Sequence, residues 1–207
     1  MALGTSYATL AVLKTRLGIG DTNDDVAAQL ALDSATMQIE GVCGRQFNDA
    51  GSASARIYYP DSLTTVTVDD FWIGAAITVA LDYSNAGTYS TVITSTNYQL
   101  EPLNGVVDGT PGFPYYRIRA IQTWYPLWYT SIGDPRTSIQ ITAQWGWSAV
   151  PTPVQEACLL LAEEIFKLKD APFGVAGFGA MGAVRVRENP KVMALLERYI
   201  RTPILVA

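Results

Sequence analysis

The feature that most constrains the fold is a change of residue pattern in the middle of the chain. From residue 56 to residue 147, short runs rich in Thr, Val, Tyr and Ile are separated by turn-forming residues. The clearest run, 137–145 (TSIQITAQW), alternates apolar and polar residues. A period of two is typical of a half-buried strand, and short strands at this spacing favour an antiparallel sandwich or barrel. We therefore predict an antiparallel β module in which Ile139, Ile141 and Trp145 are buried.

Helical patterns occupy both flanks of this module. Thr9 is the predicted N-cap of a first helix that ends at Gly18, and Thr22 followed by Asp25 resembles a capping box that opens a second helix reaching Cys43 or Arg45. Two further helices are predicted to begin at the N-caps Thr152 and Asn189, each followed by proline. The predicted buried faces are, in chain order, Leu10, Leu13 and Leu17; Val26, Leu30, Met37, Ile39 and Val42; Val154, Ala157, Cys158, Leu161, Ile165 and Leu168; and Val192, Leu195, Leu196 and Tyr199.

These patterns together predict an α+β fold with two domains. Short helices with one apolar stripe each must pack together, so both chain ends are expected in one small helical bundle. We predict that residues 1–55 and 148–207 form this bundle and its C-terminal tail, and that residues 56–147 form the inserted antiparallel β domain. The small polar segment 48–55 is interpreted as the linker between them. Within the bundle, the helix carrying Cys158, Leu161 and Ile165 is expected to face Leu13, Leu30 or Met37.

Residues 177–182 (GFGAMG) have the glycine spacing of a dinucleotide-binding loop. That fold needs a strand before the first glycine and a helix at the third, whereas here a helix precedes the motif and an extended segment follows it. The alternative is an apolar loop that either folds back on its own bundle or packs on a partner, and we favour the partner because exposed apolar loops are rare. The predicted partner-binding residues, including some from the apolar C-terminal tail, are Phe173, Phe178, Met181, Arg185, Arg187, Ile204, Leu205 and Val206.

Residue content argues against an enzyme. The chain has no histidine, which removes Ser-His-Asp and Cys-His catalysis and His-ligated zinc. Its two cysteines, Cys43 and Cys158, are too few for a Cys-only zinc site, lack the spacing of a disulfide framework and are interpreted as small buried hydrophobes. Asp69 and Asp70 are adjacent, so on a strand they would point to opposite faces and could not act as a glycosidase pair; we interpret them as a turn. We predict no catalytic residue, no metal and no cofactor.

Charge and hydropathy argue against a duplex-DNA-binding protein and against a membrane-spanning one. The formal net charge of −5 lacks the basic stripe that a duplex-DNA-binding protein needs, although seven of the fourteen Lys and Arg residues lie at or after Lys167. No apolar run is long enough for a bilayer, and the N-terminus has no signal-peptide pattern. The aromatic segment 113–129 could stack on single-stranded nucleic acid or sugars. We favour a sheet core with an exposed rim, because the module carries few positive charges.

The helical ends resemble a known family. Residues 7–19 (YATLAVLKTRLGI) and 24–47 (DDVAAQLALDSATMQIEGVCGRQF), which end in Cys43, Gly44, Arg45 and Phe47, are similar to the opening of head–tail connector (adaptor) proteins of long-tailed bacteriophages. The segment from WGW at 145–147 through Val-Pro, a helix and the glycine-rich loop is similar to the second half of that family. The resemblance covers about 7–47 and 139–201, and the β insertion lies outside it.

The resemblance implies a structural protein of the virion. Such connectors form a homo-oligomeric ring, commonly of twelve subunits, which bridges the portal protein and the next neck or stopper protein and extends the DNA channel. Double-stranded DNA is then expected to pass through without sequence-specific binding, and the acidic balance fits a wall that does not retain it. The implied location is the neck of the virion, assembled in the host cytoplasm and away from membranes. The alternative is a carbohydrate-binding or adhesion module on a helical mount, in which Trp124 or Trp128 would contact the glycan.

Overall fold

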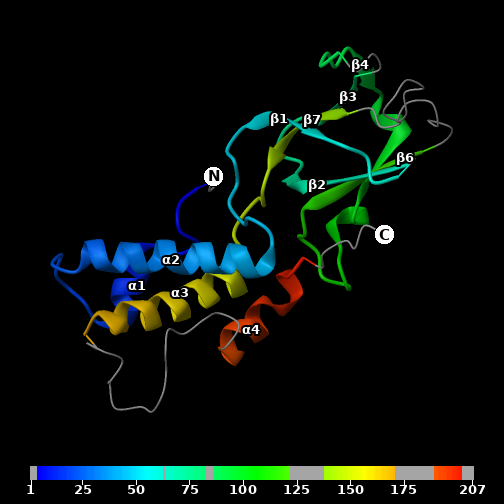
Figure 1. Ribbon diagram of the computed structural model, residues 1–207. Helices are drawn as coiled ribbons and strands as arrows, with labels where there is room; N and C mark the ends of the chain where they lie inside the picture. Colours follow the sequence, from blue (N-terminus) through cyan, green and yellow to red (C-terminus); the bar gives the residue numbers. More distant parts are fainter. Residues whose placement is uncertain (1–3, 63, 83–85, 122–137, 171–188, 202–207) are drawn as a thin grey trace. The chain divides into compact units, whose positions relative to one another are not determined.

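The computed structural model describes residues 4–62, 64–82, 86–121, 138–170 and 189–201. Helices lie at both ends of the chain and an antiparallel sheet lies between them, which confirms the predicted α+β class (Figure 1). The chain divides into two compact units. The helical unit is the described part of residues 1–48 and 149–203, and the sheet unit is the described part of residues 49–148.

The helical unit contains α1 (Leu10–Leu17), α2 (Asp25–Cys43), α3 (Thr152–Lys167) and α4 (Pro190–Leu196). Helix α3 is the central element, because α1, α2 and α4 all pack against it (Figure 1). Residues from both ends of the sequence therefore share one core. No helix in the described ranges has the length and apolar content needed to cross a bilayer.

Local chemistry explains most of the helix boundaries. The Thr9 side chain accepts a hydrogen bond from the Val12 N–H, and Gly18 ends α1 with a left-handed φ of 71°. At α4, the Asn189 side chain accepts hydrogen bonds from the N–H groups of Lys191 and Val192. These predicted caps are confirmed. Helix α4 is shorter than the pattern suggested, since a 3-10 turn (Glu197–Tyr199) follows it.

Two predicted caps are wrong. Helix α2 begins at Asp25 with Asp24 at its N-cap and no side-chain capping bond. The Asp25 carboxylate forms an ion pair with Lys14 of α1, so it is engaged there and the expected capping box with Thr22 is not formed. At α3, Pro151 is the N-cap and Thr152 is already the first helical residue.

The buried face of α2 differs from the predicted one. Val26, Leu30 and Met37 are 75%, 64% and 69% exposed, respectively. The face that packs in the core consists of Ala28, Ala31, Leu32, Ala35, Thr36, Ile39 and Cys43. Small side chains allow α3 to approach closely, and the Cys158 Sγ lies 3.6 Å from the Thr36 Oγ1. The expected contacts of α3 with Leu30 and Met37 are therefore wrong.

The predicted stripe of α3 is right in its first half. Val154, Ala157, Cys158 and Leu161 are buried, whereas Ile165 is half-buried and Leu168 is exposed. The buried face moves around the helix and ends at Leu159, Ala162 and Phe166. Leu13 of α1 and Val192 and Leu196 of α4 are buried as predicted.

The sheet unit contains seven strands in one antiparallel sheet. They are β1 (Ala53–Tyr58), β2 (Thr65–Trp72), β3 (Thr78–Leu81), β4 (Thr91–Ile93), β5 (Tyr98–Glu101), β6 (Tyr115–Ala120) and β7 (Ile139–Trp145). Strand β7 is the centre, with β1 along one edge and β3 followed by β2 along the other. Strand β6 pairs with β2, and β5 and β4 are added outside β6 and β3.

The alternation predicted for β7 is confirmed. Ile139, Ile141 and Trp145 are fully buried, and Ala143 joins them on the same face. Gln140 and Thr142 lie on the opposite face and are half-buried. The strands belong to one sheet and not to the two packed layers of a sandwich.

Two turn assignments in the sheet unit are wrong. Residues 53–55, which the composition places in a linker, form the start of β1 because their backbone pairs with residues 142–144 of β7. Asp69 and Asp70, predicted as a turn, lie inside β2. Asp69 is exposed and Asp70 is buried, so the two carboxylates do point to opposite faces.

Candidate interaction surfaces

The residues predicted to bind partners lie outside the described part of the chain. Phe173, Phe178, Met181, Arg185 and Arg187 belong to residues 171–188, and Ile204, Leu205 and Val206 belong to residues 202–207. Trp124 and Trp128 fall within 122–137, which is also outside it. The surfaces considered below therefore come from other residues.

The segment Cys43-Gly44-Arg45-x-Phe47 ends α2 in a packed junction. Gly44 adopts a left-handed φ of 63°, and the Phe47 ring lies edge-on to Tyr7 and Tyr199 at 5.5 and 5.8 Å. The Phe47 N–H donates to the Tyr7 hydroxyl, which in turn donates to Glu40 at 2.8 Å. This junction joins the start of the helical unit, the end of α2 and the segment after α4. Its visible role is structural.

The two thiols offer no reactive group at neutral pH. Cys43 and Cys158 are free and buried, as predicted. Burial raises the pKa of the Cys43 thiol from 9.0 to about 12, although the charge of Arg45 acts in the opposite direction. Burial also raises the pKa of Cys158, with a smaller opposing effect from the Thr36 hydrogen bond. Protonated buried thiols are poor nucleophiles, so neither cysteine is a candidate catalytic residue.

In the described residues, no group of three or more His, Cys, Asp or Glu side chains could hold a metal ion. The carboxylates on the sheet are engaged in hydrogen bonds. Asp49 accepts from Gln144 and Trp72, and the buried Asp70 accepts from the Trp147 indole at 3.1 Å. Burial raises the pKa of Asp49, but these bonds and the Gly51 N–H outweigh it, so the pKa is lowered. These carboxylates fix strands and loops of the sheet unit.

A shallow cavity of about 160 Å³ lies in the sheet unit. Its lining consists of Trp72, Asn104, Gly105, Gly112, Phe113, Pro114, Tyr115 and Ser148. The aromatic walls have the chemistry that binds a sugar ring. The volume is below the ~300–1,000 Å³ of typical ligand sites, so the cavity gives little support to a carbohydrate-binding function.

A cluster of polar and aromatic groups on β1 and β2 lies beside Trp145, on the core face of the sheet. The Arg56 guanidinium lies 4.5 Å from the centre of the Trp145 ring and forms an ion pair with Asp69. The Tyr58 hydroxyl donates to the same carboxylate at 2.9 Å. Ion pairs of this exposure contribute little to stability, so this cluster closes one side of the aromatic core and does not mark a binding site.

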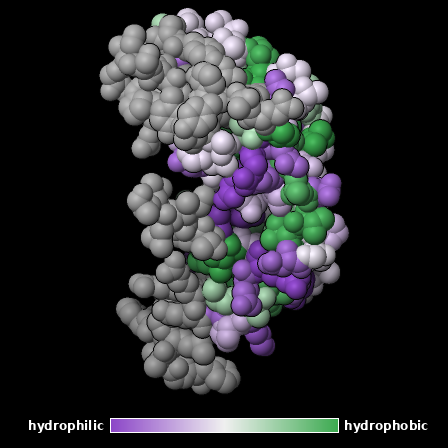
Figure 2. All heavy atoms as spheres, turned by 90° about the vertical axis from the view of Figure 1, so that its right-hand side faces the viewer, coloured by the Kyte–Doolittle hydropathy of each residue, from purple (hydrophilic) through white to green (hydrophobic). Residues whose placement is uncertain are grey.

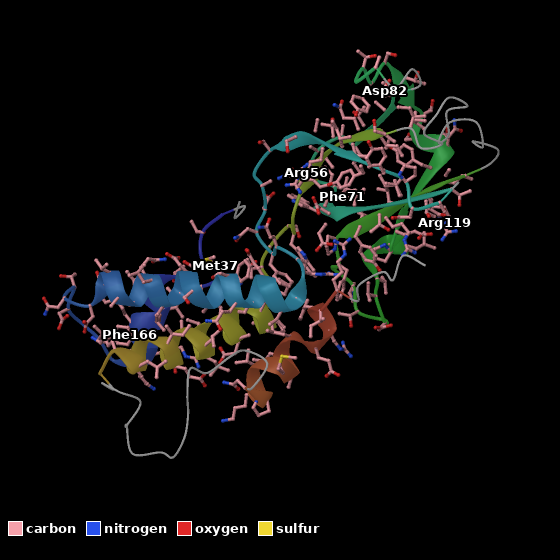
Figure 3. The ribbon with its side chains drawn as sticks, viewed as in Figure 1. Met37, Arg56, Phe71, Asp82, Arg119 and Phe166 are labelled. Carbon is pink, nitrogen blue, oxygen red and sulfur yellow. The ribbon has the colours of Figure 1, made fainter. Side chains whose placement is uncertain are left out.

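The most exposed large apolar side chains lie on α2. Val26, Leu30 and Met37 fall within about 40° of one another on the helix wheel, on the side opposite Ala28, Leu32, Ala35 and Ile39. Figure 3 shows Met37 on the side of α2 that faces away from α3. We call these three residues the α2 stripe. The stripe was misassigned to the core, although the competing spacing of Ala28, Leu32, Ala35 and Ile39 could have revealed the true packing face.

Exposed apolar residues also occur on the sheet unit. Ile57 of β1 and Val92 of β4 are on the same face, because both align with Gln140 and Ala80 across the sheet. On the surface shown in Figure 2, hydrophobic residues form several small patches that hydrophilic residues separate. That surface therefore has no single dominant apolar area, and the α2 stripe is the more concentrated candidate.

Comparison with known proteins finds one matching family. Residues 7–80 match the family of phage gp6-like head-tail connector proteins. This stretch includes α1, α2, the Cys43–Phe47 junction and most of β1 to β3. The resemblance to phage head–tail connectors is therefore confirmed. A search of curated proteins finds no match.

Solved structures share the fold of this protein over nearly the whole chain. One similar chain comes from the neck of an empty gene transfer agent (GTA) particle computed with C6 symmetry, with a TM-score of 0.57 and 20% identity over 99% of this chain and 95% of that one. Another comes from the virion of a native gene transfer agent particle, with a TM-score of 0.55 and 21% identity over 96% and 92% of the two chains. At this identity the likeness concerns the fold.

Proposed function

We propose that this chain is a non-enzymatic structural protein of the phage neck. It forms an oligomeric ring that bridges the portal protein and the next neck protein and extends the DNA channel. The observation that carries this proposal is the connector-family match over residues 7–80, which coincides with α1, α2 and the junction around Phe47. The fold likeness to a neck chain of a gene transfer agent supports it.

The copy number in this proposal is twelve. One similar neck was computed with six-fold symmetry, and a twelve-subunit ring contains six-fold symmetry. The net charge of −5 suits a channel through which double-stranded DNA passes without being held. We also propose that the ring is assembled in the host cytoplasm and is located in the neck of the virion. Segments 171–187 and 202–207 stay our predicted contacts with neighbouring subunits and portal.

The mass of the assembled protein tests this function. We expect the full chain alone to be a monomer or small oligomer, and the chain mixed with its portal protein to give a ring of about twelve copies on the portal. Removing the residues after Arg201 should weaken portal docking and leave the melting temperature of the monomer nearly unchanged. A chain that stays monomeric with portal, by native mass spectrometry and electron microscopy, would overturn the proposal.

A further inference from the structure

The helical unit has two chemically different outer surfaces. Helix α3 packs against both α2 and α4 (Figure 1). The side of α2 opposite its buried face carries the α2 stripe, and the exposed residues of α4 and the following turn include Lys191, Ala194 and Arg198. The two surfaces belong to one compact unit, so their separation is a property of every subunit.

The α2 surface combines apolar area with negative charge. Asp24 and Asp25, at the N-terminal end of α2, form ion pairs with Lys169 and Lys14, so the negative charge beside the stripe comes from Asp33. Asp33 is exposed and lies within about 20° of Val26 on the helix wheel. It accepts hydrogen bonds from Ser6 and Gln29, both uncharged, so its charge persists at this surface. Apolar area that the subunit itself leaves uncovered is typical of a protein interface.

The α4 surface has the opposite charge and a smaller apolar content. Lys191 and Arg198 flank Ala194, which is exposed, and Leu195, which is half-buried. Residues 189–201 contain Lys191, Arg198 and Arg201 against Glu197. The α2 stripe with its acidic neighbour and the α4 surface with its basic residues are complementary in charge, and both offer apolar side chains.

We infer that the α2 stripe docks on the α4 surface of a second copy of this chain. The contact pairs two different surfaces and is therefore head-to-tail, which gives a closed ring when the rotation between subunits closes. This inference rests on the proposed ring and adds its subunit interface. Asp33 of one copy meets Lys191 or Arg198 of the next, and Leu30 and Met37 cover Ala194 and Leu195.

Chemical cross-linking tests the contact directly. Two full-length variants, Leu30→Cys and Ala194→Cys, are mixed, assembled with portal and treated with a short bis-maleimide. The native Cys43 and Cys158 are buried and do not compete. We expect one dominant product that joins residue 30 of one subunit to residue 194 of another. Val92→Cys in place of Ala194→Cys is the matched control, since Val92 is also exposed but lies on the sheet unit.

The alternative products separate the competing explanations. Cross-links between two copies of Leu30→Cys alone would mean a two-fold contact, and cross-links from residue 30 to portal would mean that portal covers the stripe. Either result overturns the inference. A ring that forms without the 30–194 product overturns the interface and leaves the proposed function intact. Failure to assemble on portal overturns the proposed function itself.

A charge exchange gives a second readout. Asp33→Lys and Lys191→Glu should each lower ring formation at least ~10-fold, because like charges then face each other across the contact. The double variant restores opposite charges in every contact of a head-to-tail ring and should recover most of the loss. Unchanged melting temperatures of the monomers show that the loss lies in association. Equal, additive defects in the double variant would overturn the pairing.

Discussion

The two units place their large apolar side chains differently. The sheet unit buries its largest apolar side chains, with Trp145, Phe71, Ile139 and Ile141 inside the sheet, and its exposed apolar residues, such as Ile57 and Val92, lie on separate strands. The α2–α3 contact is built from alanines, a threonine and two cysteines as well as leucine, and α2 leaves Val26, Leu30 and Met37 in solvent. The sheet unit thus uses its largest apolar residues for its own stability, and its exposed ones are scattered. The helical unit retains apolar area for a partner.

The largest effect is expected in the core of the sheet unit. Trp145→Ala removes a fully buried ring that packs on Phe71 and whose indole N–H donates to the Ser54 carbonyl at 2.8 Å. We expect a loss of ~3–5 kcal/mol in the free energy of unfolding of the sheet unit, measured by denaturant titration followed by circular dichroism. A loss below ~1 kcal/mol would contradict the assignment of this strand as the centre of the sheet.

A smaller but clear effect is expected in the core of the helical unit. Leu161 of α3 is fully buried, so Leu161→Ala should cost ~2–5 kcal/mol, nearer the lower end if α2 and α4 move to fill the gap. The same titration applies. Phe166→Leu, which keeps a large apolar side chain at a buried position of α3, is a milder control. If Leu161→Ala costs less than ~1 kcal/mol, this stripe of α3 is an interface and the contrast between the units fails.

Alkaline pH should weaken the helical unit before the sheet unit. The pKa of Cys43 is raised by burial from 9.0 to about 12, so folding favours the protonated thiol. Its contribution to stability is fully present below pH 9 and is lost as pH rises from 9 towards 12, with a limiting slope of about 1.4 kcal/mol per pH unit. Cys43→Ala should flatten the decline between pH 9 and 10.5. An unchanged slope in thermal melts would contradict this account.

The smallest effect is expected at the α2 stripe. Leu30→Gln and Met37→Gln change exposed side chains on a helix and should alter the free energy of unfolding by no more than ~0.5 kcal/mol. The same double variant should reduce assembly on portal. A destabilisation of the monomer above ~1.5 kcal/mol would show that these residues belong to the core after all, and would remove the contrast between the two units.

The sequence predicts strands of this protein better than the packing face of its long helix. In β7, alternation leaves one choice of buried face, and Ile139, Ile141 and Trp145 follow it. In α2, apolar residues occur on two opposite faces. The larger side chains lie on the face that is exposed, so side-chain size alone favours the wrong face. Close packing against α3 decides in favour of Ala28, Ala31 and Ala35, and that information lies more than a hundred residues away in the sequence.

The burial of Asp70 could not be predicted from the sequence either. The register of β2 against β6 shifts between Thr67 and Phe71, which allows Asp70 and Phe71 to be buried consecutively. The Trp147 indole that bonds to Asp70 lies on a distant segment. From the sequence alone, two adjacent aspartates are therefore predicted to form a turn, because the tryptophan that binds Asp70 is distant in the chain. The α2 stripe was visible in the sequence only as part of the predicted core.

The insertion of the sheet unit between Asn48 and Ala149 has a mechanical consequence. Tension applied between the first and last described residues acts first on the helical unit, because both of these residues belong to it. The contacts of Phe47 with Tyr7 and Tyr199, and the hydrogen bond from the Arg201 N–H to the Cys43 carbonyl, lie directly in that load path. The strands carry force only after this junction has opened.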